Sequence, residues 1–167
     1  LKNVRRGRIK EYAEKYDVQY YEGKRPWEIV DGPIHVAQPC ATQNELNLDE
    51  AKHMVNNGLL IVAEGANMPT EPDAVDYFID NKIPFAPGKA ANAGGVATSG
   101  IEMMQNHIGT SWTSEEVDKQ LHQIMINIHK NSVAAAEKYG YPGNYVMGAN
   151  IAGFLKIADS MIDQGHW

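Results

Sequence analysis

Short apolar runs alternate with amphipathic helical patterns through the middle of the chain. Residues 59–63 form a continuous apolar run of strand length, which is typical of a parallel strand buried on both faces. Shorter runs at 34–37 and 83–86 predict two further strands, each followed by a proline. The spacing of strand and helix signals predicts βαβ units and a parallel sheet.

The helices between these strands begin at recognisable signals. Asn47 is followed three residues later by Glu50, a capping box that predicts a helix ending before Gly58. The segment 70–73 opens a second helix, which carries an apolar stripe on one face. Both helices fit the crossover connections of a parallel sheet.

After residue 89 the alternation ends and only helices are expected. One helix follows the small-residue segment 90–100, and a long one begins at the capping box of Thr113 and Glu116. A last helix is predicted over 145–164, with apolar residues on one stripe. The layout is therefore part of an α/β sheet followed by a helical segment.

The first thirty residues are less regular. The stretch through Lys15 fits an amphipathic helix interrupted at Gly7. Residues 18–21 predict a short strand, and the glycine and proline within 22–27 predict a loop. The chain begins without methionine and already in a helical pattern, so we expect it to be the later part of a longer protein.

Composition narrows the class of protein. The 167 residues are 43% hydrophobic and 22% charged, which suits a chain with an ordinary core. The formal net charge of −6 argues against a nucleic-acid partner, which would favour a basic face. No apolar run reaches 18 residues and the N-terminus is polar, so neither a membrane partner nor a signal peptide is expected.

Cysteine and histidine offer little chemistry. The single cysteine, Cys40, excludes an internal disulfide and is compatible with a reducing cytosol. No base is evident beside it, so we expect a buried, inert thiol. His122 and His129 share a helix face without a third ligand at zinc spacing, so no metal site is expected.

Three polar loops follow the three predicted strands, at 39–44, 64–69 and 87–92. Each loop offers a small residue that lets a ligand approach the backbone, and an amide or hydroxyl that can donate and accept hydrogen bonds. Ligands of open parallel sheets bind beyond the carboxyl ends of the strands. The loops together predict a site suited to a carboxamide or a ribose, whereas ordinary turn chemistry could explain any one of them.

Asn92 and Ser99 are seven residues apart and would share a face if the helix already includes Asn92. Gly95 and Val96 lie between them on that face and add little bulk. Such a strip would admit a flat ring or a small amino acid, and tight helix packing is the alternative.

A basic cluster at the N-terminus has two interpretations, a solvated face or a phosphate contact. Its members are Lys2, Arg5, Arg6, Arg8 and Lys10.

Several long motifs, in order along the chain, closely resemble the C-terminal part of hexameric bacterial glutamate dehydrogenase. They are residues 39–46, 63–70, 86–96, 98–100, 111–113 and 148–154. The resemblance implies the later half of a Rossmann-like parallel sheet followed by C-terminal helices. Residues 1–100 would form a partial dinucleotide-binding domain, and 101–167 a helical segment that packs back toward the N-terminal domain of the longer protein.

The resemblance also implies an activity. The longer protein would interconvert L-glutamate and 2-oxoglutarate plus ammonia by hydride transfer, with NADP as cofactor and NAD as the alternative. It would be a cytoplasmic homo-oligomer, a hexamer in this family. A related dehydrogenase of the leucine or phenylalanine type, and a non-catalytic module for folding or assembly, are the other interpretations.

Site residues carry over by motif. Ala41, Thr42 and Asn67 would line the nicotinamide and its ribose. Asn92 would lie near the nicotinamide or the substrate, and Ser99 would contact a substrate carboxylate.

The resemblance gives the basic cluster a meaning as well. In NADP-using members a lysine and arginines at the places of Lys2, Arg5 and Arg8 lie near the adenosine 2′-phosphate, which favours NADP. The family's glycine-rich pyrophosphate turn, substrate lysines, catalytic lysine and catalytic aspartate have no counterpart in this chain. We therefore expect no catalytic residue here and no activity from the chain alone.

Overall fold

The computed structural model describes residues 6–165 and divides the chain into two compact units, Leu1–Val30 and Asp31–Trp167. The described residues of the first unit include helices α2 (Ile9–Tyr16) and α3 (Pro26–Ile29). Helix α2 ends at Asp17, whose left-handed backbone (φ 49°) turns the chain. The helix expected through Lys15 is confirmed from Ile9 onward.

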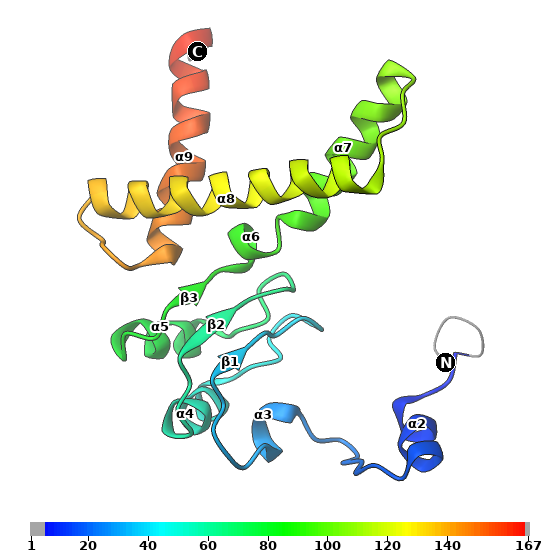
Figure 1. Cartoon of the computed structure of the whole chain (residues 1–167). Helices are drawn as coiled ribbons and strands as arrows, with labels where there is room; N and C mark the ends of the chain where they lie inside the picture. Colours follow the sequence, from blue (N-terminus) through cyan, green and yellow to red (C-terminus); the bar gives the residue numbers. More distant parts are fainter. Residues whose placement is uncertain (1–5, 166–167) are drawn as a thin grey trace. The chain divides into compact units, whose positions relative to one another are not determined.

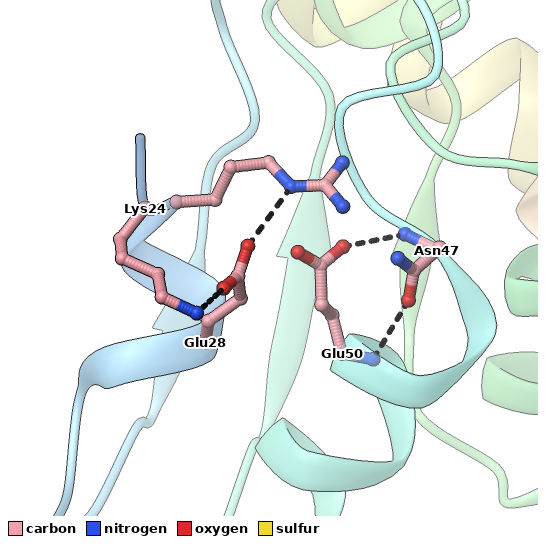
Figure 2. A network of polar contacts seen from close by, with 5 residues as sticks. Lys24, Glu28, Asn47 and Glu50 are labelled. Carbon is pink, nitrogen blue, oxygen red and sulfur yellow. Dashed lines mark hydrogen bonds and ion pairs between the residues drawn. The ribbon is translucent and has the colours of Figure 1, made fainter. Parts of the chain in front are cut away.

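Two expectations for this unit are wrong. Residues 18–21 form no strand, because a strand needs a neighbour for its backbone groups and no described residue pairs with this segment. The loop expected over 22–27 gives way to α3 at Pro26, because the fixed φ of proline suits the first position of a helix. Glu28 of α3 accepts a hydrogen bond from Lys24 Nζ at 3.0 Å and pairs with Arg25 Nε at 3.5 Å (Figure 2).

The second unit is built on a parallel sheet of short strands, ordered as in the sequence (Figure 1). The strands are β1 (Val36–Ala37), β2 (Ile61–Ala63) and β3 (Phe85–Ala86). Both neighbouring pairs are parallel. The three strands predicted from the apolar runs are therefore present, although each is shorter than its run.

Helices α4 (Leu48–Asn56) and α5 (Pro72–Asp80) form the crossovers and contact each other. The capping box predicted for α4 is confirmed (Figure 2). The Glu50 backbone N–H donates to Asn47 Oδ1 at 3.0 Å, and the Asn47 N–H donates to Glu50 Oε2 at 2.8 Å. These bonds satisfy two of the groups that a helix leaves open at its start.

The core lies between these helices and one face of the sheet. Phe78 of α5 stacks on Phe85 of β3, with ring centroids 5.9 Å apart. Val62 pairs with Phe85 in register and is fully buried. The expectation that residues 59–63 are buried on both faces is wrong, since Leu60 is 62% and Ile61 37% exposed. Side chains of a strand alternate between faces, so Ile61 lies on the face opposite Val62, and Leu60 precedes the strand.

The rest of the unit is helical (Figure 1). It comprises α6 (Gly88–Ala91), α7 (Gly94–Ile108), α8 (Ser114–Lys138) and α9 (Tyr145–Gln164). The capping box of Thr113 and Glu116 is present, and α9 has the bounds predicted for it. Helix α8 crosses α9 where Gly148 lies against the backbone carbonyl of Ser132.

The α/β architecture expected from the sequence is therefore confirmed. Within the described residues, none of the helices combines the length and apolar character needed to cross a membrane.

Candidate functional site

The loops that follow β1, β2 and β3 meet at one cavity of about 530 Å³. Its lining comes from all three loops and from the start of α7: Cys40, Ala41, Gly65, Ala66, Asn67, Asn92 and Val96. The cavity lies at the carboxyl edge of the sheet, where open α/β folds bind ligands. Its volume falls within the usual range for small-molecule sites.

Two amide side chains define the polar part of this cavity. Asn92 Nδ2 donates to the Ala66 carbonyl at 3.1 Å and to Asn67 Oδ1 at 2.7 Å. These two bonds use both amide hydrogens of Asn92. Asn92 Oδ1 and Asn67 Nδ2 have no hydrogen-bond partner among the described residues, so the pair presents one acceptor and one donor. A primary carboxamide offers the complementary pair.

A buried carboxylate holds the loops around the cavity. Glu64, only 5% exposed, follows β2 directly. Its Oε1 accepts from the Thr70 N–H at 3.3 Å, and its Oε2 accepts from the Gly88 N–H at 2.6 Å. The sequence analysis did not single out Glu64, although a lone carboxylate at the end of an apolar strand was a usable signal.

Two glycines allow the loops to approach this closely. A Cβ atom added at Gly88 would lie 2.6 Å from the Ala66 carbonyl oxygen, too close for any side chain. One added at Gly65 would overlap Cys40 Sγ. Backbone therefore meets backbone and thiol directly beside the cavity, so these two glycines serve the close packing of the loops on one another.

The burial predicted for Cys40 is wrong. We expected a buried thiol, but Cys40 is exposed and lines the cavity. The preceding Pro39 is fully buried, and its carbonyl accepts from the Gly65 N–H at 2.9 Å. The chain leaves the core at this point, so Cys40 stands at the edge of the sheet.

The neighbouring residues of the same loop differ in position. Ala41 lines the cavity, and its N–H donates to Glu45 Oε1 at 3.1 Å. Thr42 is exposed and is not among the lining residues.

The helical strip expected from Asn92 to Ser99 is not formed, because it required both residues to lie in one helix. Asn92 is the C-cap that follows α6, where its N–H donates to the Gly88 carbonyl, and α7 starts only at Gly94. Asn92 faces the cavity from between two helices. Ser99 lies on α7, exposed, with its hydroxyl donating to the Gly95 carbonyl at 3.3 Å.

The basic residues predicted to contact a phosphate are not among the lining residues given above. Lys2 and Arg5 lie outside the described residues. Arg8 is exposed at the start of α2, in the first unit, where its N–H donates to Glu11 Oε1 at 3.3 Å. Their phosphate role stays a prediction, as do the roles of Ala41, Thr42, Asn67, Asn92 and Ser99.

A side-chain contact links the site to the last helix. Lys89 of α6 donates from Nζ to Asn150 Oδ1 of α9. Gly88, which precedes Lys89 in the chain, donates its N–H to Glu64. The contact with α9 is therefore next to the loops of the site. Across residues 6–165, no group of three or more His, Cys, Asp or Glu side chains is arranged to hold a metal ion.

A parallel sheet with a polar cavity at its carboxyl edge defines an α/β protein with a candidate ligand site where such folds bind ligands. The sequence model of the Glutamate/Leucine/Phenylalanine/Valine dehydrogenase family matches residues 1–165, and the chain belongs to this family. The family expected from the loop motifs is thereby confirmed.

Similar proteins of known sequence and structure support the same family. The chain is 60% identical over 167 residues to an NAD(P)-specific glutamate dehydrogenase of Xylanibacter ruminicola, and 54% identical over 170 residues to an NADP-specific one of Haemophilus influenzae. Each match covers 99% of this chain and 36% of the relative. The crystal structure of Plasmodium falciparum glutamate dehydrogenase matches all of this chain with a TM-score of 0.93 at 47% identity. The chain spans 36% of that structure too.

Proposed function

We propose that the cavity holds the nicotinamide end of NADP, with NAD as the alternative, in an enzyme that interconverts L-glutamate and 2-oxoglutarate plus ammonia. The observation that carries this proposal is the pair of Asn67 and Asn92, whose open donor and acceptor match the carboxamide of the nicotinamide ring. The names of the relatives, NADP-specific and NAD(P)-specific glutamate dehydrogenase, support both the substrate class and the choice of NADP with NAD as the alternative.

The residues that line the cavity fit the nicotinamide end of the cofactor. The cavity of about 530 Å³ accommodates a nicotinamide with its ribose. The close packing at Gly65 and Gly88 fixes the loops that surround it. When bound, the cofactor supplies hydride exchange with the carbon that carries the amino group. The chain's own residues orient it: Asn67 and Asn92 fix the rotation of the carboxamide, and Ala41 lets the ring approach the backbone.

The remaining predicted residues complete the proposal. Thr42 would bond the ribose, and Ser99 would hold a substrate carboxylate from α7. Lys2, Arg5 and Arg8 would contact the 2′-phosphate of NADP, by charge-assisted hydrogen bonds.

Proton transfer has no candidate in this cavity. Among its lining residues only Cys40 can ionise, and no described histidine or carboxylate lines it. A general acid or base must lie within hydrogen-bond reach of the reacting atoms. We therefore propose that the chain by itself binds the nicotinamide end without catalysing the reaction, and that the complete enzyme is a cytoplasmic hexamer.

Nicotinamide mononucleotide tests the proposal on this chain, because it needs neither a pyrophosphate turn nor an adenosine site. In ¹⁵N-labelled protein we expect saturable shifts of the Asn67 and Asn92 side-chain amides and of the Gly65 N–H. Shifts confined to other surfaces would contradict the site. A folded chain that does not bind the nucleotide would favour the non-catalytic module.

The substrate needs the longer protein. Activity with glutamate, assayed beside leucine and phenylalanine, distinguishes the members of this family. Activity on the apolar amino acids alone would replace the glutamate assignment by the leucine or phenylalanine type.

A further inference from the structure

Helix α6 is a single short turn that carries part of the proposed nicotinamide site. The Gly88 N–H at its start donates to Glu64 Oε2 at 2.6 Å. Asn92, which follows its last residue, lines the cavity and donates from Nδ2 to Asn67 Oδ1 at 2.7 Å. These bonds attach α6 to the loop after β2. A helix this short has too few backbone hydrogen bonds to keep its orientation alone, so its outer contacts decide where Asn92 points.

The other side of α6 faces the helical part of the chain (Figure 1). The apolar packing there is open, because Ala90 and Ala91 line a cavity of about 340 Å³ together with Met125 of α8 and Tyr145 of α9. Two methyl side chains beside a cavity offer little surface to hold a helix in one orientation. A directional polar contact therefore has more influence on the orientation of α6 than these apolar contacts have.

Lys89 provides such a contact. Its Nζ donates to Asn150 Oδ1 of α9, which is 61 residues away in the chain. Asn150 has a firm support, because the nearby Gly148 is buried where α9 packs against the Ser132 carbonyl of α8. Lys89 and Asn92 are separated by less than one helical turn, so a rotation of α6 that moves one residue also moves the other.

We propose that Lys89 and Asn150 are a positioning pair, through which α9 holds Asn92 in the orientation that binds the nicotinamide carboxamide. This inference rests on the proposed function, and it makes the helical segment after the sheet a support of the cofactor site. Neither residue of the pair lines the cavity, so the pair acts through Asn92. Without the pair α6 rotates more freely, and a ligand must order Asn92 when it binds, which weakens the affinity.

The test measures the dissociation constant of oxidised nicotinamide mononucleotide on the 167-residue chain, by NMR titration. Lys89→Met removes the donor and keeps most of the aliphatic stem, and Asn150→Ala removes the acceptor. We expect each variant to bind about three- to fivefold more weakly, as for the loss of one exposed hydrogen bond to a charged group. Because the two side chains form one contact, the double variant should bind no more weakly than either single variant.

Further measurements separate positioning from support of the fold. Asn150 is exposed within α9, where alanine has the higher helix propensity, so Asn150→Ala should not lower the free energy of unfolding. Asn150→Asp keeps an acceptor oxygen for Lys89 at nearly the same shape and should retain the wild-type affinity. The Asn150 side-chain amide of the wild type should shift when the nucleotide binds, and Lys89→Met should remove this response.

Two control variants make matched changes elsewhere on the same helices. Lys156→Met removes an exposed lysine from α9. Asn127→Ala removes an exposed asparagine of α8 that accepts a hydrogen bond from the Gln123 side chain. Both controls should leave the dissociation constant unchanged.

The outcomes are distinct. Losses of affinity in Lys89→Met and Asn150→Ala no larger than those of the controls would overturn the inference, while the proposed function stands. Additive losses in the double variant, or a loss in Asn150→Ala that Asn150→Asp does not restore, would overturn it as well. Failure of the folded wild type to bind the nucleotide would overturn the proposed nicotinamide site itself.

Discussion

Asn92 and Asn67, which are 25 residues apart in the chain, are joined by a hydrogen bond of 2.7 Å from Nδ2 to Oδ1 across the end of the sheet. The same Nδ2 donates to the Ala66 carbonyl, so one side chain connects the loop after β3 with the loop after β2. The two loops cannot move apart without breaking both bonds. The geometry of the cavity is therefore set before any ligand arrives, which reduces the entropy that binding costs.

Asn92→Ala should weaken binding of oxidised nicotinamide mononucleotide about tenfold, because it removes both loop contacts and the open Oδ1 acceptor. The measurement is the dissociation constant from an NMR titration. Asn81→Ala is the matched control, since Asn81 also donates its side-chain N–H to a backbone carbonyl, that of Tyr77, but at the end of α5. Equal losses in the two variants would remove Asn92 from the site.

Gly88→Ala should destabilise the chain by roughly 1–3 kcal/mol, because the new Cβ would lie 2.6 Å from the Ala66 carbonyl oxygen and the backbone would have to shift. Urea denaturation measures the change in the free energy of unfolding. Gly100→Ala is the control: this glycine lies inside α7 with nothing within 4 Å of the added Cβ. It should stabilise by about 1 kcal/mol through helix propensity. A neutral Gly88→Ala would contradict the close approach.

Local signals predicted the helices well. The bounds of α9 agree with the sequence because both its ends are encoded locally: Asn144 accepts from the Met147 N–H at 3.0 Å, and Gly165 follows the last turn. The capping boxes at Asn47 and Thr113 are equally local. Parallel strands depend on distant partners, which is why residues 18–21, with a strand-like sequence, form no strand.

The site was predictable only in part. Polar residues after each strand indicated where the loops would meet. The helix limit between Asn92 and Gly94 was missed, because small residues fit both a turn and a helix start. The position of Glu64 at the end of an apolar strand was a usable signal, but its role was not predictable, because its partners are the backbone N–H groups of Thr70 and Gly88 and such partners leave no pattern in a sequence.

In the first unit, Lys24→Met should raise the pKa of Glu28 toward its ordinary value. The hydrogen bond from Lys24 is the main cause that lowers this pKa, and the Lys24 charge and the contacts with Arg25 act in the same direction. A carboxyl whose pKa is lowered on folding adds stability above its unfolded pKa, and this is lost as pH falls through the folded value. The pair is exposed, so the contribution is small.

A ¹³C titration of the Glu28 carboxyl by NMR measures this shift. Lys52→Met is the control, since Lys52 pairs with Asp49 on α4 at 3.5 Å and should leave the Glu28 titration unchanged. An unaltered pKa of Glu28 in Lys24→Met would assign the lowering to Arg25 instead.

Gly148 is the contact point of α8 and α9, and its replacement by alanine should be the most disruptive single methyl addition to this helix pair. The new Cβ would overlap the backbone carbonyl of Ser132 and lie 3.1 Å from Ala136 Cβ, so the helices would have to separate. Neither obstacle is the flexible end of a side chain, and we expect a loss of roughly 1–3 kcal/mol or more in the free energy of unfolding. Gly153→Ala, on the same helix with nothing within 4 Å of its Cβ, should instead stabilise by about 0.5–1 kcal/mol. Urea denaturation of both variants measures the difference, and similar values for the two would show that α8 and α9 do not pack through Gly148.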